Sequence, residues 1–105
     1  MSRGNLFEQI PADLTEEVFE TLRQKGKVKI ERIISSGQSS PASGWYDQEQ
    51  DEWVIVLQGS ATLAFADGSA VDRAEGDYLA IPAHTKHRVT RTSSQPPTLW
   101  LAVHY

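Results

Sequence analysis

The segment DEWVIVLQG, residues 51–59, is the stretch that decides the fold. Its middle is a run of apolar, mostly β-branched or aromatic residues, which is typical of a strand with apolar surroundings on both faces. Gly59 ends the run and predicts a turn. Because strand side chains alternate, Glu52 shares a face with Val54 and Val56. A buried carboxylate without a partner is costly, so Glu52 indicates a functional site.

Further short strands are predicted on both sides of this segment. Ser/Gly/Pro-rich residues at 35–44 predict a long loop, which suggests a lip over a site. Asp67-Gly68 is a tight-hairpin signal between two of the strands. The spacing of strands and turns predicts an all-β sandwich or small barrel. The expected strands, besides the one above, are 27–34, 60–66, 69–74, 78–82, 87–92 and 98–105.

The first organised segment, 13–26, is predicted to be a short α-helix. Asp13 and Glu16 have the spacing of a capping box. Gly26 suits a C-terminal cap. An apolar stripe at four-residue spacing supports the same prediction, formed by Leu14, Val18 and Leu22.

The composition excludes several classes of function. The chain has 105 residues, 39% hydrophobic and 23% charged, which suits one globular domain spanning 1–105. Its formal net charge is −4 and it has no Lys/Arg cluster, so nucleic acid is not an expected partner. No apolar run is long enough to span a membrane, and the N-terminus lacks the apolar core of a signal peptide. Without cysteine, disulfide and thiolate chemistry are excluded, and we expect a cytoplasmic protein.

Two segments, 51–59 and 75–87, resemble the two motifs of the cupin family in order, content and spacing. Glutamate, six residues and glycine fit the end of the first motif; glycine, five residues, proline and then histidine fit the second. The resemblance implies an all-β, cupin-like small barrel (a double-stranded β-helix or jelly roll) over 27–105, preceded by the helix at 13–26. The matching positions are Glu52, Gly59, Gly76, Pro82 and His87.

The first motif lacks the two histidines that the family places before the glutamate. Counting back four residues from Glu52 puts these positions at Trp45 and Asp47. Counting back three puts them at Tyr46 and Gln48. The sequence leaves both alignments open.

The resemblance implies a divalent-metal site, with zinc, iron, manganese or nickel as candidates. Two carboxylates and one imidazole with open positions suit zinc or a harder transition metal. The predicted function is therefore the binding of a small polar or anionic molecule in the lumen of the barrel, at a metal held by Asp47, Glu52 and His87. Additional ligands or substrate contacts are sought among Tyr46, Gln48, His84, Trp45 and Trp100.

Two alternatives dispense with the metal. In the first, Glu52 and His87 pair with each other or act as acid and base in a ligand-binding or sugar-modifying pocket. In the second, the barrel is a non-catalytic structural or sensor domain. The sequence does not choose between an enzyme and a binding protein, and His104 is expected to be a structural or interface histidine.

The strand face opposite Glu52 is too apolar to face water. We expect it to be covered by the helix at 13–26, by another part of the chain, or by a second copy of the chain. The sequence thus predicts a homodimer. The face is formed by Trp53, Ile55 and Leu57.

Overall fold

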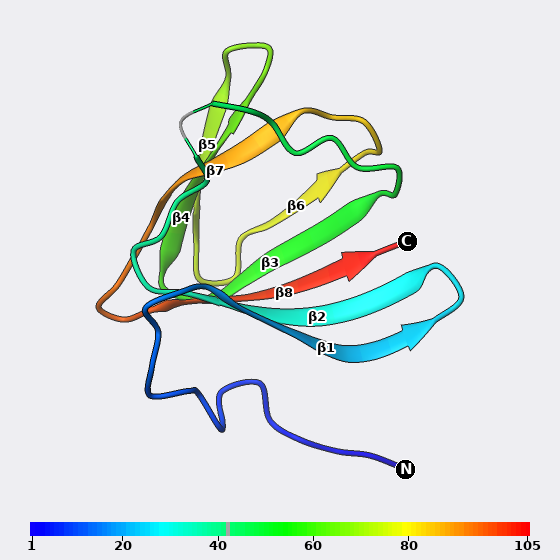
Figure 1. Ribbon diagram of the computed structural model, residues 1–105, viewed down its shortest axis with the longest axis vertical. Helices are drawn as coiled ribbons and strands as arrows, with labels where there is room; N and C mark the ends of the chain where they lie inside the picture. The colour runs from blue at the N-terminus through cyan, green and yellow to red at the C-terminus, as the bar shows by residue number, and fades with distance from the viewer. Residues whose placement is uncertain (42) are drawn as a thin grey trace.

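The computed structural model describes residues 1–41 and 43–105. The chain forms two antiparallel sheets, one ordered β1-β2-β8-β3-β6 and the other β5-β4-β7 (Figure 1). The all-β architecture expected from the spacing of strands and turns is confirmed. The strands are β1 (Val18–Lys25), β2 (Val28–Ser35), β3 (Glu52–Gln58), β4 (Ser60–Phe65), β5 (Ala70–Ala74), β6 (Tyr78–Ile81), β7 (His87–Thr92) and β8 (Thr98–His104).

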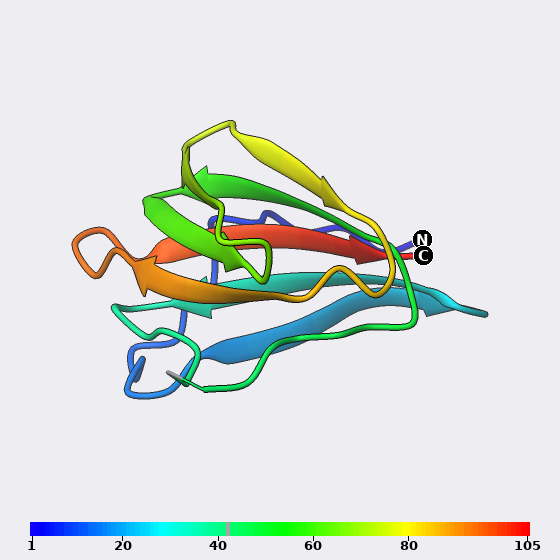
Figure 2. The same ribbon diagram turned by 90° about the horizontal axis from the view of Figure 1, so that it is seen from above.

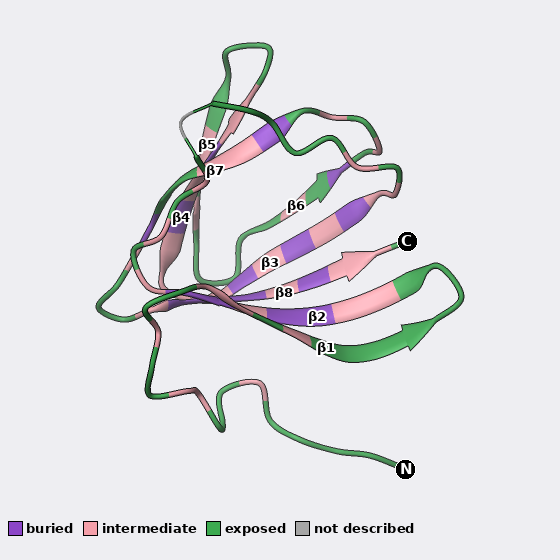
Figure 3. Cartoon of the chain, viewed as in Figure 1, coloured by how far each residue is buried: buried purple, intermediate pink, exposed green. Residues whose placement is uncertain are grey.

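The core lies between the two sheets, which face each other when the molecule is seen from above (Figure 2). Buried and half-buried residues alternate along β3, as period two requires (Figure 3). Strand β1, at the edge of the larger sheet, is mostly exposed. The buried apolar cluster joins both sheets through Val54, Val56, Ala61, Leu63, Ile81, Trp100 and Ala102.

The predicted helix at 13–26 is wrong, because this segment contains β1 and the described residues form no helix. Thr15 N donates to the Asp13 carboxylate at 3.0 Å, which closes a local turn and caps no helix. Gly26, with φ 57°, occupies the hairpin turn that joins β1 to β2. Along β1, backbone hydrogen bonds to β2 replace those of a helix.

The described residues form no helix, and so they contain no helix long and apolar enough to cross a membrane. The cytoplasmic location and the lack of a nucleic-acid partner remain predictions. The loop expected at 35–44 includes residue 42, which lies outside the described residues.

The outer face of β2 carries an arginine that fixes the N-terminal segment to the sheet. Arg32 is buried and donates to the carbonyl oxygens of Leu6, Glu8 and Gln9 at 3.0, 2.7 and 3.3 Å. It also pairs with Glu20 at 2.7 Å. The opposite, polar face of β2 therefore turns toward the interior.

Gly59 makes the turn from β3 into β4 possible. Its φ is 81°, a conformation that other residues rarely adopt. A Cβ atom here would meet the Pro97 carbonyl oxygen at 2.9 Å and Thr98 Cα at 3.0 Å, with the Ser93 hydroxyl closer still. The chain entering β8 thus passes directly over this glycine.

Replacing Gly59 with alanine is expected to lower the free energy of unfolding by about 2–4 kcal/mol, because it combines a left-handed backbone with overpacking. Gly68 is a matched control, since its φ is 92° but nothing lies within 4 Å of a Cβ there. Gly68→Ala should lose only about 1 kcal/mol. Urea denaturation measures both, and equal losses would contradict a steric role for Gly59.

The apolar outer face of β3 is left without the helix that was expected to cover it. Trp53 stacks on Tyr78 of β6, with ring centroids 5.6 Å apart and planes at 29°. Tyr78 is 60% exposed, so this aromatic pair is available for contact. A second copy of the chain remains our expectation for this face.

We predict a mass of twice 11.7 kDa by light scattering at micromolar concentration. Tyr78→Glu should shift the population toward monomer by placing a charge in the apolar contact. Phe7→Glu, at another exposed aromatic residue, should leave the mass unchanged. A monomeric wild-type protein would refute the dimer.

Candidate functional site: an acid–base pocket inside the barrel

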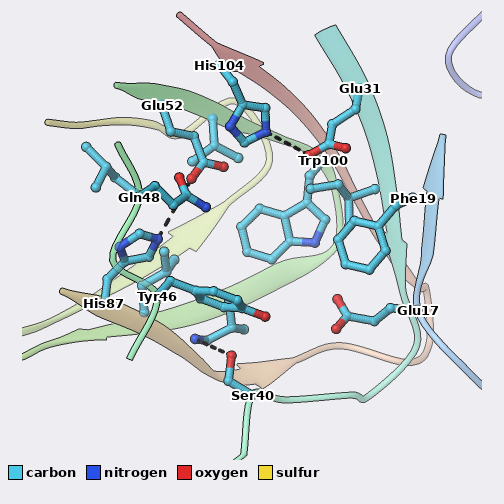
Figure 4. A pocket seen from close by; sticks show the side chains of 15 residues that line it. Glu17, Phe19, Glu31, Ser40, Tyr46, Gln48, Glu52, His87, Trp100 and His104 are labelled. Carbon is cyan, nitrogen blue, oxygen red and sulfur yellow. Dashed lines mark hydrogen bonds and ion pairs between the residues drawn. The ribbon is translucent and has the colours of Figure 1, made fainter. Parts of the chain in front are cut away.

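A cavity of about 190 Å³ lies in the interior of the barrel (Figure 4). Side chains from both sheets and from the loop before β3 line it. One half contains Glu52 and His87, with Gln48 beside them. The other half is formed by aromatic rings and the carboxylate of Glu17. Strand alternation therefore brings polar groups into a space otherwise walled by the apolar core.

Glu52 is the first residue of β3, where it pairs with His104 of β8 and Ile81 of β6. Only 8% of its surface is exposed, and none of its described neighbours donates a hydrogen bond to its carboxyl. Burial raises the pKa of Glu52, and Glu31 acts in the same direction, while His104 and His87 oppose the shift. The carboxyl group is thus disposed to hold a proton.

His87, at the start of β7, presents one free ring nitrogen to Glu52. Its Nδ1 lies 2.7 Å from the Thr85 carbonyl oxygen, so Nδ1 carries the proton and donates it. In the neutral ring, Nε2 is then unprotonated, and it lies 3.8 Å from Glu52 Oε1. That separation is too long for a direct hydrogen bond, so both groups remain available to a ligand.

The loop before β3 is aligned by backbone pairing between Tyr46 and His87. Tyr46 N donates to His87 O at 2.8 Å, and His87 N donates to Tyr46 O at 3.2 Å. This pairing places Tyr46 and Gln48 in the cavity wall. The alignment that counts back three residues from Glu52 is therefore the one that the structure adopts.

Asp47 points away from the cavity. Its carboxylate pairs with His84 Nδ1 at 2.8 Å, and both side chains are well exposed. Trp45 is also outside, with its ring 4.4 Å from the Arg88 guanidinium. The structure thus brings Glu52 and His87 together but separates Asp47, His84 and Trp45 from them.

Sequence reasoning missed three titratable residues that line the cavity, namely Glu17, Glu31 and His104. His104, expected to be structural, lines it and lies with Nε2 2.7 Å from Glu31 Oε1. Lys29 Nζ lies 3.5 Å from the other oxygen of Glu31. Glu17 was hidden by the helix prediction. The signal that could have found His104 was its shared strand face with Trp100.

The cavity does not fit the predicted divalent metal. Where the family carries two histidines, the wall has the phenol of Tyr46 and the amide of Gln48. His104 and Glu31 are bound to each other. Across residues 1–41 and 43–105, no three His, Asp or Glu side chains are placed to hold a metal ion. The remaining donors are Glu52 and His87, too few for a zinc or iron site.

Comparison with known proteins identifies the family. The family model of the cupin domain matches residues 32–104, so the chain belongs to the cupin family. A candidate mannose-6-phosphate isomerase from Ralstonia eutropha is 47% identical, with TM-score 0.94, over 99% of this chain and 97% of that one.

Two more distant structures share the fold. A cupin superfamily protein from Desulfitobacterium hafniense is 24% identical, with TM-score 0.76, over 90% of this chain and 82% of its own. An RmlC-like cupin with a double-stranded β-helix fold, from Methanocaldococcus jannaschii, is 19% identical, with TM-score 0.71, over 91% and 85%. No curated protein sequence matches the chain.

The buried carboxyl predicts a specific pH dependence. A carboxyl with a raised pKa contributes stability that is complete below the ordinary value of 4.5 and is lost as pH rises through its folded pKa. Glu52→Gln, neutral at every pH, should therefore match the wild type in acid and exceed it in free energy of unfolding at higher pH.

Urea denaturation from about pH 4 to about pH 8 measures this difference. Its size will also reflect the groups facing Glu52 from other strands, namely Glu31, His87 and His104. Glu49→Gln, at an exposed carboxylate, serves as the control and should show no such divergence. A difference between Glu52→Gln and wild type that stays constant with pH would contradict the raised pKa.

Proposed function

We propose that this cupin binds a small polar molecule in its cavity and transfers protons on it without a metal. The observation that carries the proposal is the 3.8 Å separation of His87 Nε2 from Glu52 Oε1, with both atoms facing the same cavity. Neither atom has a hydrogen-bond partner among the described residues. A polar ligand between them would supply the missing partners.

The two groups suit opposite roles. In the neutral ring, His87 Nε2 can accept a proton because Nδ1 donates to the Thr85 carbonyl oxygen, while the carboxyl of Glu52, whose pKa is raised by burial, can donate one. On a hydroxy-carbonyl compound, His87 would take the proton from the carbon next to the carbonyl. Glu52 would protonate the carbonyl oxygen, which gives an enediol.

Completing the reaction requires each proton to be returned. The protonated His87 delivers its proton to the former carbonyl carbon, and the hydroxyl proton of the neighbouring oxygen passes to Glu52. The net result is an aldose–ketose type isomerisation with no change in oxidation state overall. The Ralstonia relative is named for a reaction of this class, which supports the proposal.

The charge of the cavity argues against a phosphorylated or otherwise anionic ligand. Three glutamates line it, and none of its described lining residues is lysine or arginine. A phosphate group would therefore find no guanidinium or ammonium partner there. We accordingly propose the reaction class of the relative's name for this chain, without the phosphate of its substrate.

The proposal is tested by deuterium exchange at the carbon next to the carbonyl, followed by NMR on a panel of small unphosphorylated aldoses, ketoses and their amino derivatives. We expect exchange to survive EDTA. Glu52→Gln and His87→Gln should each slow it by about 10²–10⁴-fold, the usual contribution of an acid–base group.

Asp47→Asn is the matched control, because Asp47 lies outside the cavity, and it should leave exchange unchanged. Elemental analysis of protein purified without a histidine tag should find much less than one metal ion per chain. Exchange that EDTA abolishes and a divalent metal restores would overturn the metal-free reaction. Absence of exchange with every member of the panel would refute proton transfer as the function.

A further inference from the structure

The half of the cavity opposite His87 takes no part in the proton transfer proposed above. Glu17, which precedes β1, lies there with Phe19 of β1 and Trp100 of β8, and Tyr46 of the loop borders both halves, with its ring centroid 5.7 Å from that of His87 (Figure 4). Three aromatic rings and one carboxylate thus line the cavity near its opening, where Phe19 and Tyr46 are exposed.

A hydrogen-bonded relay fixes the carboxylate. The Trp100 indole N–H donates to the Ser35 hydroxyl at 3.2 Å, and that hydroxyl lies 2.7 Å from Glu17 Oε2. Ser35 is fully buried and Trp100 is 4% exposed, so the relay is part of the core. A serine hydroxyl has a single proton, which here goes to Glu17. Glu17 therefore acts as an acceptor, and its second oxygen has no partner among the described residues.

Aromatic rings form the rest of the wall around this carboxylate. Because the indole N–H of Trp100 is already bound to Ser35, Trp100 offers the cavity its aromatic ring without a free donor. Phe19 and Tyr46 are 58% and 46% exposed, which leaves two large rings at the opening of the cavity without cover. A carboxylate beside aromatic faces is the arrangement that attracts an alkylammonium group.

The rest of the cavity favours the same charge. No described lining residue is a lysine or arginine, and Lys29, outside the wall, pairs with Glu31 at 3.5 Å. Glu52, buried and 3.8 Å from His87 Nε2, is a further hydrogen-bond partner for a ligand that reaches across. An ammonium group would gain from Glu17 and from the rings, whereas a phosphate in the same place would be repelled.

We infer that the ligand of this cavity carries an ammonium group, seated among Glu17, Tyr46 and Trp100. As a statement about the substrate, this rests on the proposed function: the substrate would be an amino-substituted hydroxy-carbonyl compound whose reacting carbons lie between Glu52 and His87. The ammonium site itself depends only on the contacts of the aromatic half.

Three probes built on one ring test the inference: glucosamine with its amine protonated, glucose, and glucose 6-phosphate. Binding is followed by NMR through the indole N–H of Trp100. We expect glucosamine to bind about tenfold more tightly than glucose, and glucose 6-phosphate to bind most weakly. Choline, as a bare alkylammonium compound, should also shift the Trp100 signal.

Glu17→Gln keeps the shape and the hydrogen bond from Ser35 but removes the charge, so it should abolish the preference for glucosamine. Glu16→Gln, at the exposed neighbouring position, is the matched control and should retain it. Tyr46→Leu removes one ring without touching the relay, and should weaken glucosamine binding more than glucose binding.

Equal affinities for glucosamine and glucose, a preference for glucose 6-phosphate, or no response of Trp100 to either amine would overturn the inference. The results that would contradict the proposed function are different ones. Glu52→Gln is expected to keep the amine preference while losing proton exchange. If wild-type protein prefers the amine but exchanges no proton on any compound, the ammonium site stands and proton transfer is refuted.

Discussion

The carboxyl of Glu52, buried in the barrel and receiving no hydrogen bond from the described residues, is the constraint from which the site follows. Ionising such a group away from water is costly, so burial raises the pKa of Glu52 above its ordinary value. The same strand carries Val54 and Val56 into the core. A slip of one residue in β3 would turn both valines outward, so the packing that stabilises the fold also holds Glu52 in place.

The loop before β3 determines what chemistry surrounds that carboxyl. Backbone pairing of Tyr46 with His87 sets its alignment, and His84 N donates to the Gln48 carbonyl oxygen at 2.7 Å. Outside, Asp47 is held by the His84 side chain. The loop is therefore fixed from both sides, with a phenol and an amide inside where a metal-binding cupin has imidazoles. Among the described residues the donors are therefore too few for a metal, while the acid and base of the proposed function, Glu52 and His87, remain.

Many of the strands and site residues could be predicted from local sequence patterns. The predictions that were wrong or left open share a cause. Spacing within the two motifs identified Glu52 and His87, and alternation identified β3, β7 and β8. The segment 13–26 failed because a four-residue spacing lies on one face of a strand as well as of a helix. Because this segment was predicted to be a helix, the positions of Glu17 and Phe19 in the cavity wall were not predicted either. The choice between Asp47 and Gln48 depended on long-range pairing with His87, which no local pattern contains.

The carboxyl groups of Glu17 and Glu52 line the same cavity but suit different roles, because their hydrogen-bonding neighbours differ. Glu17 receives a hydrogen bond from Ser35, which suits an acceptor that stays in place and offers negative charge. Glu52 receives none and lies deeper, which suits a proton donor. A ligand that satisfies both must present a positive group to one side and a proton-accepting oxygen to the other. Under the proposed function, the cavity would select by charge at Glu17 and react at Glu52 and His87, a division of roles that requires no metal.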